Sequence, residues 1–266
     1  MSRHPEPRLG PTELTTVWQS ASLLLAYPDE RLTEVLPLVR DAVGSLPDRL
    51  GSPLAAVAEH LERTPLTELQ IDYVDTFDTR RRCNLFLTYF LHGDTRKRGL
   101  ALLRFKQTYL RSGFVLDATP AEGEELPDHL CVVLEYAATV DQRLGWPLLL
   151  DHRASLELLR MSLRDRGSGW TGALEAVCAT LPPVKGSERD LVQRLALEGP
   201  PAEEVGLTPY GTPAFDARLE AVAPGVVSTD RSQARCSTTQ STASTTGTGA
   251  ISTDRSQARC STTGGN

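Results

Sequence analysis

Apolar side chains recur every three or four positions from about residue 12 to residue 198, which is the spacing of an amphipathic α-helix. Alternating strand patterns are absent from this stretch. The segments "SPLAAVAEHLER" and "TPLTELQIDYVDTF" each begin with a hydroxyl residue followed by Pro, and this pair predicts helix starts at Ser52 and Thr64. The pattern predicts an all-α fold, a compact bundle of about eight helices with short connections.

The sequence changes in character after about residue 181, where seven prolines precede a Ser/Thr-rich end. The segment "STDRSQARCSTT" occurs at 228–239 and again at 252–263, and two polar copies have little apolar surface to bury. We therefore expect four regions along the chain. They are a flexible N-terminus (1–11), a helical domain (12–198), a Pro-rich irregular segment (199–225) and a disordered tail (226–266).

Composition excludes several classes of protein. A formal net charge of −6 disfavours a nucleic-acid partner, because phosphate binding needs a basic face. No apolar run approaches the roughly 18 residues that cross a bilayer, so we expect no stable membrane insertion and a cytoplasmic location. Five widely separated cysteines without a C-x-x-C pair predict reduced thiols, with neither a disulfide framework nor a metal site.

No catalytic pattern is present. The histidines lack H-x-x-x-H spacing and no G-x-S-x-G appears. The segment "GSGWTG" at 167–172 matches G-x-G-x-x-G, but it follows a helical pattern where a dinucleotide-binding site needs a strand, so we interpret it as a turn between helices. We expect no catalytic residue, no cofactor site and no enzyme activity.

Two clusters are candidates for binding. Tyr73 and Phe77 lie on an apolar stripe, which is usually core, while Asp72, Asp75 and Asp78 recur along a neighbouring face. These carboxylates are either solvated or bind an Arg-containing peptide.

Asp128 and His129 follow Glu125 at a predicted helix start. The carboxylates there either simply complement the helix dipole, or Asp128 and His129 orient a bound peptide. Asp78 and Asp128 are expected outside the core.

The segments "YVDTFDTRRRCNLFLTYFLHGDTRKRGLALLRFKQTYLRSGF" and "ELPDHLCVVLEYAA" resemble the NarJ family of nitrate reductase assembly chaperones, within the wider TorD-like and DmsD-like group of redox-enzyme maturation proteins. The similarity covers about residues 15 to 180. Its motifs are Y-x-x-x-F-D at 73–78, G-D-x-x-x-R-G at 93–99 and E-L-P-D at 125–128. Cys131 departs from the pattern, since related sequences often have Pro there.

The resemblance implies a TorD-like, all-helical chaperone that binds the catalytic α subunit of respiratory nitrate reductase. It implies recognition of that subunit's N-terminal segment and of its cofactor-free form, assistance in molybdenum cofactor insertion and complex assembly, and absence from the finished enzyme. The residues then expected to bind the partner peptide are Tyr73, Phe77, Asp78, Asp128, His129, Leu130 and Glu135.

Two other classes stay open. One is a maturation enzyme that binds the molybdenum cofactor or a nucleotide, which would need a phosphate cradle. The other is a helical regulatory adaptor without a redox-enzyme partner.

Overall fold

The computed structural model describes residues 5–116 and 126–201. The expected disordered tail, most of the Pro-rich segment and residues 1–4 lie outside the described residues. Apart from one isolated β-bridge, the regular structure that is described is helical, which confirms the all-α prediction. Eleven α-helices are described: α1 (Pro11–Leu25), α2 (Leu32–Gly44), α3 (Asp48–Arg63), α4 (Leu66–Tyr73), α5 (Tyr89–His92), α6 (Arg96–Arg111), α7 (Leu130–Glu135), α8 (Gln142–Asp151), α9 (Arg153–Asp165), α10 (Thr171–Thr180) and α11 (Ser187–Glu198).

The described helices outnumber the eight that were expected, because several periodic stretches are divided. The apolar pattern over 147–165 is shared by α8 and α9, which are separated at His152. Two helices end in a wider π-helical turn. After α4 comes the π turn Val74–Asp78 (η1), and after α7 comes Tyr136–Val140 (η3). Periodicity alone does not reveal where one helix gives way to the next.

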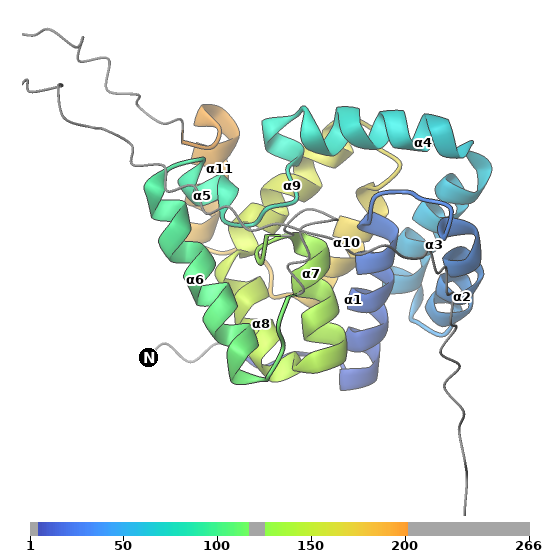
Figure 1. The fold of residues 1–266 in the computed structure, drawn as a ribbon, viewed down its shortest axis with the longest axis horizontal. Coiled ribbons are helices and arrows are strands. Elements are labelled where there is room, and N and C mark those ends of the chain that lie inside the picture. The colour runs from blue at the N-terminus through green and yellow to red at the C-terminus, as the bar shows by residue number, and fades with distance from the viewer. Residues whose placement is uncertain (1–4, 117–125, 202–266) are drawn as a thin grey trace, which may run out of the picture. The chain divides into compact units, whose positions relative to one another are not determined.

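Helix α1 lies in the interior and packs against α2, α3, α7 and α10. Figure 1 shows it between α7 and α3. Its buried side includes Leu14, Val17, Trp18 and Ala21, a spacing of three and four that keeps one face toward the core. The Trp18 indole N–H donates to Thr180 Oγ1 at 3.1 Å, which satisfies a polar group that would otherwise be buried without a partner.

Helices α3 and α10 approach each other closely. A Cβ atom on Gly172 would lie 2.1 Å from the Pro53 carbonyl oxygen, so only glycine permits this spacing. Pro53 is inside α3, which begins at Asp48, so the helix start expected at Ser52 was wrong. Pro47, with its carbonyl accepting from Leu50 N and Gly51 N, starts the helix one turn earlier.

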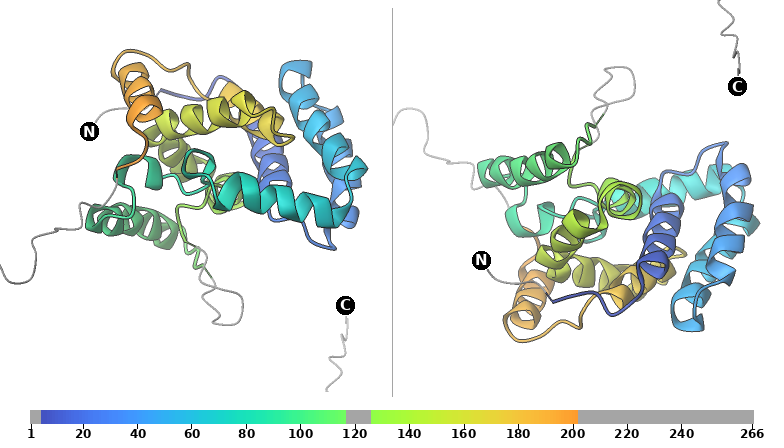
Figure 2. Two further views of the ribbon diagram at one scale, coloured as in Figure 1. Left: turned by 90° about the horizontal axis from the view of Figure 1, so that it is seen from above. Right: turned by 90° about the horizontal axis from the view of Figure 1, so that it is seen from below.

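Helix α6 and the pair α2 and α3 lie at opposite ends of the described bundle (Figures 1 and 2). Helix α4 connects the α3 end to the middle of the bundle (Figure 1). The surfaces at these two ends carry charges of opposite sign.

Candidate functional site

A short backbone pairing joins the two segments that carry the sequence motifs. Leu87 N donates to Asp128 O at 3.1 Å, and Leu130 N donates to Leu85 O at 2.9 Å. Phe86 and His129 thereby form an antiparallel bridge. The segment before α5 and the start of α7 are therefore held side by side.

Asp128 is fully buried at this junction, at 0% exposure, so the expectation that it lies outside the core was wrong. Its Oδ2 atom accepts from Thr88 Oγ1 at 2.6 Å and from Thr88 N at 3.0 Å. A carboxylate that accepts two such bonds is stabilised where it would otherwise be too costly to bury. Asp128 therefore fixes the chain before α5 to the start of α7.

Arg98 provides the opposite charge. One of its guanidinium nitrogens lies 3.8 Å from Asp128 Oδ2, and its Nε donates to Thr88 Oγ1 at 3.3 Å. The guanidinium carbon also lies 5.3 Å from the ring centre of Phe86 and 5.8 Å from that of Tyr89, within cation–π range. The motif arginine thus neutralises a buried carboxylate from within the chain.

The rest of the G-D-x-x-x-R-G motif shapes the start of α6. Asp94 accepts from Arg98 at 3.1 Å, four residues on, in an exposed ion pair. Gly93 has φ of +55°, a backbone conformation that other residues rarely adopt, and this lets the chain turn between α5 and α6.

His129 lies beside the same junction and is half-buried. Its ring packs edge-on against Phe86, with 5.1 Å between ring centres. Burial lowers its pKa from 6.5 to about 4, although the neighbouring Asp128 acts in the opposite direction. The imidazole is therefore neutral near pH 7.

Tyr73 and Phe77 belong to a different cluster, an aromatic group around Trp170. Trp170 lies 5.7 Å from Tyr73 and 5.5 Å from Phe77 between ring centres, and Tyr73 O–H donates to Leu25 O at 3.0 Å. Tyr73 and Phe77 are 6% and 3% exposed, which confirms that their stripe is core. Trp170 comes from the G-x-G-x-x-G turn between α9 and α10, so the interpretation of that segment as a turn between helices is confirmed.

The three carboxylates differ in their surroundings, with Asp72 inside α4 and Asp75 and Asp78 in the π turn that follows it. Asp75 accepts from Arg80 at 3.1 Å and from Arg166 at 3.0 Å, and these hydrogen bonds and charges, Arg80 first, lower its pKa. Asp75 is therefore already paired with arginines of the same chain. Asp78 is exposed, as a contact with another molecule requires.

The seven residues expected at the peptide site thus divide by burial. The structure brings Asp128, His129 and Leu130 together at the junction with Thr88, and Tyr73 with Phe77 around Trp170. Asp78 and Glu135 are exposed, His129 is half-buried, and the other four are buried: Tyr73, Phe77, Asp128 and Leu130. Their partners Thr88 and Trp170 were not predicted from the sequence, because apolar periodicity gives no signal for them.

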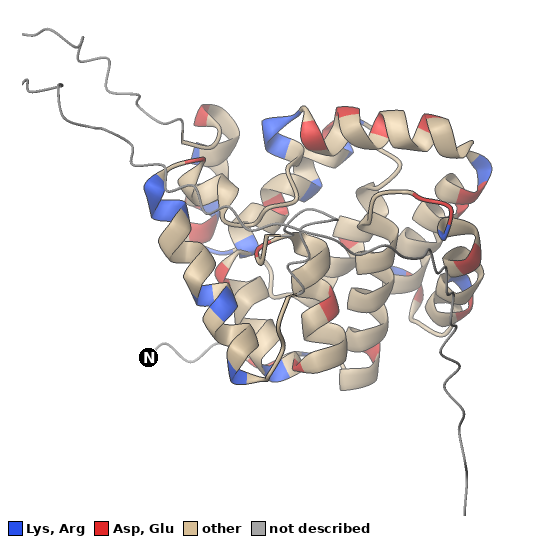
Figure 3. Ribbon diagram, in the orientation of Figure 1, with Lys and Arg blue, Asp and Glu red and all other residues tan. Residues whose placement is uncertain are grey.

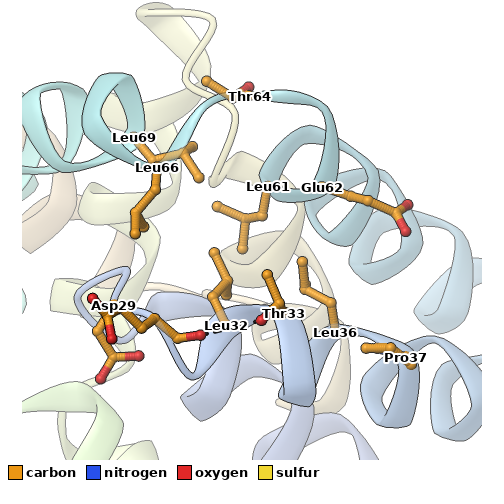
Figure 4. Close-up of a pocket in the computed structure, with 11 residues that line it drawn as sticks. Asp29, Leu32, Thr33, Leu36, Pro37, Leu61, Glu62, Thr64, Leu66 and Leu69 are labelled. Carbon is orange, nitrogen blue, oxygen red and sulfur yellow. Dashed lines mark hydrogen bonds between the residues drawn. The ribbon is translucent and has the colours of Figure 1, made fainter.

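A cleft of about 280 Å³ opens where α2, α3 and α4 meet. Figure 4 shows Leu32 and Leu36 of α2 facing Leu61 of α3 and the leucines of α4 across it. Leu36 and Leu61 are almost fully buried, whereas Leu32 is partly exposed. The cleft therefore has an apolar floor and is open to solvent at Leu32.

The rim of this cleft is acidic. Asp29, Glu30 and Glu62 line it, and Glu62 forms an ion pair with Arg40. The surrounding stretch 29–78 contains eleven acidic and four basic side chains. An apolar floor with a negative rim suits a segment that combines an apolar side chain with basic ones.

The opposite end of the bundle is basic. Helix α6 contains six Lys and Arg residues and no acidic residue. Figure 3 shows basic residues along α6 and acidic residues along α4. The described part of the chain thus presents surfaces of opposite sign at α6 and at the cleft.

The described residues show no arrangement of three or more His, Cys, Asp or Glu side chains that could hold a metal ion. Cys83 and Cys178 carry free thiols, and burial raises the pKa of Cys178 to about 11. Over residues 5–116 and 126–201, every helix is too short or too polar to cross a membrane.

A family model described as the nitrate reductase delta subunit matches residues 44–176, half of the chain. The chain belongs to this family. The match includes α3, the aromatic cluster around Trp170 and the junction at Asp128. The matched region leaves out α1, whose buried side chains also belong to the core, and α11.

Named relatives agree with this assignment. The chain is 42% identical over 165 residues to the nitrate reductase-like protein NarX of Mycobacterium tuberculosis, covering 62% of this chain and 24% of NarX. It is 30% identical over 174 residues to the probable nitrate reductase molybdenum cofactor assembly chaperone NarJ of Bacillus subtilis, covering 65% of this chain and 92% of that protein. With the probable chaperone NarW of Escherichia coli K12 it shares 31% identity over 156 residues, 58% of this chain and 63% of NarW. The chain spans about a quarter of the length of NarX.

Proposed function

We propose that this protein is a maturation chaperone that binds the catalytic α subunit of a nitrate reductase in its cofactor-free form and assists molybdenum cofactor insertion. The names of the relatives NarJ and NarW support the client class. The protein would act by binding rather than by catalysis, and would not remain in the finished enzyme. We place this activity in the cytoplasm, in keeping with the free thiols of Cys83 and Cys178.

The acidic, apolar cleft between α2, α3 and α4 is the observation that carries the proposal. Its volume of about 280 Å³ accommodates one or two apolar side chains, and its rim carries three carboxylates. We infer that it receives an amphipathic, basic segment from the N-terminal part of the client subunit. Burial of the apolar side chain would supply affinity, and the carboxylates would set its orientation.

The residues first expected at the peptide site take two roles in this proposal. Exposed Asp78 and Glu135, with half-buried His129, would contact the client directly. Buried Tyr73, Phe77, Asp128 and Leu130 would instead hold the helices that present them. Asp78 ends the π turn that follows α4, and the first residues of α4 line the cleft.

The test is calorimetric titration of a synthetic peptide from the N-terminus of the nitrate reductase α subunit. In Thr33→Trp, an indole replaces an exposed side chain that lines the cleft and fills its entrance. Thr12→Trp is the matched control, because Thr12 is also exposed on a helix, α1, but does not line the cleft. We expect Thr33→Trp to weaken binding at least about tenfold, which is about 1.4 kcal/mol, and Thr12→Trp to leave it unchanged.

A second pair tests the charge. Glu30→Gln removes a carboxylate from the rim, and Glu34→Gln removes one from the first turn of α2 outside the cleft. Both variants lose one negative charge, so long-range attraction changes equally. Only Glu30→Gln should weaken binding further, by about 0.2–1 kcal/mol. Equal affinity of the Thr33→Trp and wild-type proteins would exclude the cleft, and a peptide that does not bind the wild type would exclude the client.

A further inference from the structure

Helix α6 exposes apolar side chains on the face that points away from the core. Phe105 and Tyr109 are buried, whereas Leu100, Leu103 and Leu110 are 73%, 51% and 63% exposed. At 100° per residue the three leucines lie within about 80° of one another, opposite the buried pair. Large exposed leucines gathered on one stripe mark a contact surface more often than a solvated one.

Basic side chains border this leucine stripe. Arg104 and Arg111 follow one flank of the helix and Lys106 the other, and all three are exposed. Arg98 differs, because it turns inward to Thr88 and Asp128. The outer face of α6 therefore combines an apolar centre with cationic edges, although the whole chain has a formal net charge of −6.

A groove of about 570 Å³ lies beside the stripe, between α6 and α8. Leu110 on one side and Leu144, Pro147 and Leu148 on the other form its apolar lining. Arg104 and Arg111 also line it, and Arg104 forms an ion pair with Asp151 of α8. A groove of this kind can receive side chains that a partner inserts, whereas a flat surface cannot.

We propose that the outer face of α6, together with this groove, binds an acidic amphipathic helix of a partner polypeptide. The partner's apolar side chains would lie along Leu100, Leu103 and Leu110 and enter the groove, and its carboxylates would meet Arg111. Charge complementarity identifies the occupant, because five of the six basic residues of α6 are exposed and the helix has no acidic residue. This surface goes beyond the proposed function, since a basic client segment suits the acidic cleft and is repelled here.

Fluorescence anisotropy with a designed probe tests the surface. The probe is a labelled 18-residue peptide of Leu, Ala and Glu with leucines on one helical face, and its control is a peptide of the same composition in scrambled order. We expect the wild-type protein to bind the amphipathic peptide at least tenfold more tightly than the scrambled one. Equal affinity for the two peptides would overturn the proposal.

Variants locate the contact. Leu103→Gln combined with Leu110→Gln should weaken binding at least tenfold, and Arg111→Gln about threefold with a smaller dependence on salt. Leu197→Gln is the matched control, because Leu197 is 84% exposed on α11, and it should bind as the wild type does. Unchanged affinity in the double variant, with its helical circular-dichroism signal intact, would overturn the assignment to α6.

Two further measurements separate other occupants. Sedimentation velocity of the wild type should show no concentration-dependent dimer that the double variant lacks, since such a dimer would make a second copy the occupant. Cosedimentation with vesicles containing 30% anionic lipid should be weak and the same in the wild type and the double variant. Vesicle binding that the double variant loses would assign the face to a membrane surface instead and overturn the proposal.

Discussion

Asp128 accepts two hydrogen bonds from Thr88, a residue 40 positions earlier in the chain. The pair is buried and links the segment before α5 to the start of α7. Arg98, 14% exposed, adds its charge at 3.8 Å. A carboxylate in the E-L-P-D motif therefore stabilises the local structure. Because it is buried, it can affect the binding of a partner only indirectly, through that structure.

We first predict that Asp128→Ala destabilises the protein by about 2–4 kcal/mol. The substitution removes a charge-assisted bond, leaves the Thr88 N–H without its buried acceptor and leaves the Arg98 guanidinium without its buried counter-charge. Asp94→Ala is the control, since Asp94 also pairs with Arg98 but is 72% exposed, and it should cost less than about 1 kcal/mol. Urea unfolding measures both, and equal losses would contradict the structural role of Asp128.

The second prediction concerns the contact between α3 and α10. Gly172→Ala should destabilise the protein by about 2 kcal/mol or more, because its methyl group would lie 2.1 Å from the Pro53 carbonyl oxygen and push the helices apart. Gly99→Ala is the matched control in α6, where a Cβ meets nothing within 4 Å, and it should stabilise by about 0.5–1 kcal/mol. The midpoint of thermal unfolding should fall for Gly172→Ala and rise for Gly99→Ala. Shifts in the same direction would contradict the close approach of α3 and α10.

Helix content was predictable from the sequence because amphipathic periodicity reports burial, and Phe105 and Tyr109 obey it. Helix ends were less predictable. Ser52–Pro53 has the form of a helix start, yet α3 begins at Asp48 because Pro47 supplies the first carbonyl acceptor. Local residue preferences compete with tertiary packing. Here the packing retains the additional helical turn before Ser52.

The candidate site was predictable only in part. A family resemblance selects Asp128 and Arg98, but spacing gives no indication that they meet, since Thr88 and the bridge at Phe86 bring them together. Burial of Asp128 could not be foreseen for the same reason: a carboxylate next to a predicted helix start is normally solvent-exposed. The acidic cleft depends on three helices meeting, which a single sequence does not specify.

The third prediction is a loss of stability in mild acid that depends on His129. Its pKa is lowered to about 4 in the folded protein, so the unfolded chain, with a pKa near 6.5, binds the proton more readily between these values. Stability therefore falls as the pH drops from about 6.5 toward 4. Between pH 7 and pH 5, the free energy of unfolding of His129→Gln should fall by about 2 kcal/mol less than that of the wild type.

Urea midpoints at the two pH values measure this difference. Burial also lowers the pKa of His92 and of His152, so a slope should persist in the variant. The variant of His129 must nevertheless have the smaller slope. Identical slopes in the two proteins would show that His129 titrates as it does in water.

The last prediction compares two exposed carboxylates in binding the client peptide. Asp78 ends the π turn that continues α4 toward the middle of the bundle, whereas Glu198 ends α11. If the basic peptide lies in the cleft and extends along α4, Asp78→Asn should weaken binding by about 0.2–1 kcal/mol, the range for an exposed ion pair. Glu198→Gln removes the same charge elsewhere and should have no effect beyond the small change in net charge.

Salt dependence gives the second readout for Asp78. Screening at 0.5 M salt should abolish the difference between Asp78→Asn and the wild type, because the Debye length then falls to about 4 Å. The thermal midpoint should be unchanged, since the side chain is exposed. If Asp78→Asn and Glu198→Gln bind the peptide equally at low salt, the peptide does not extend along α4, and the contact is confined to the cleft and its rim of Asp29, Glu30 and Glu62.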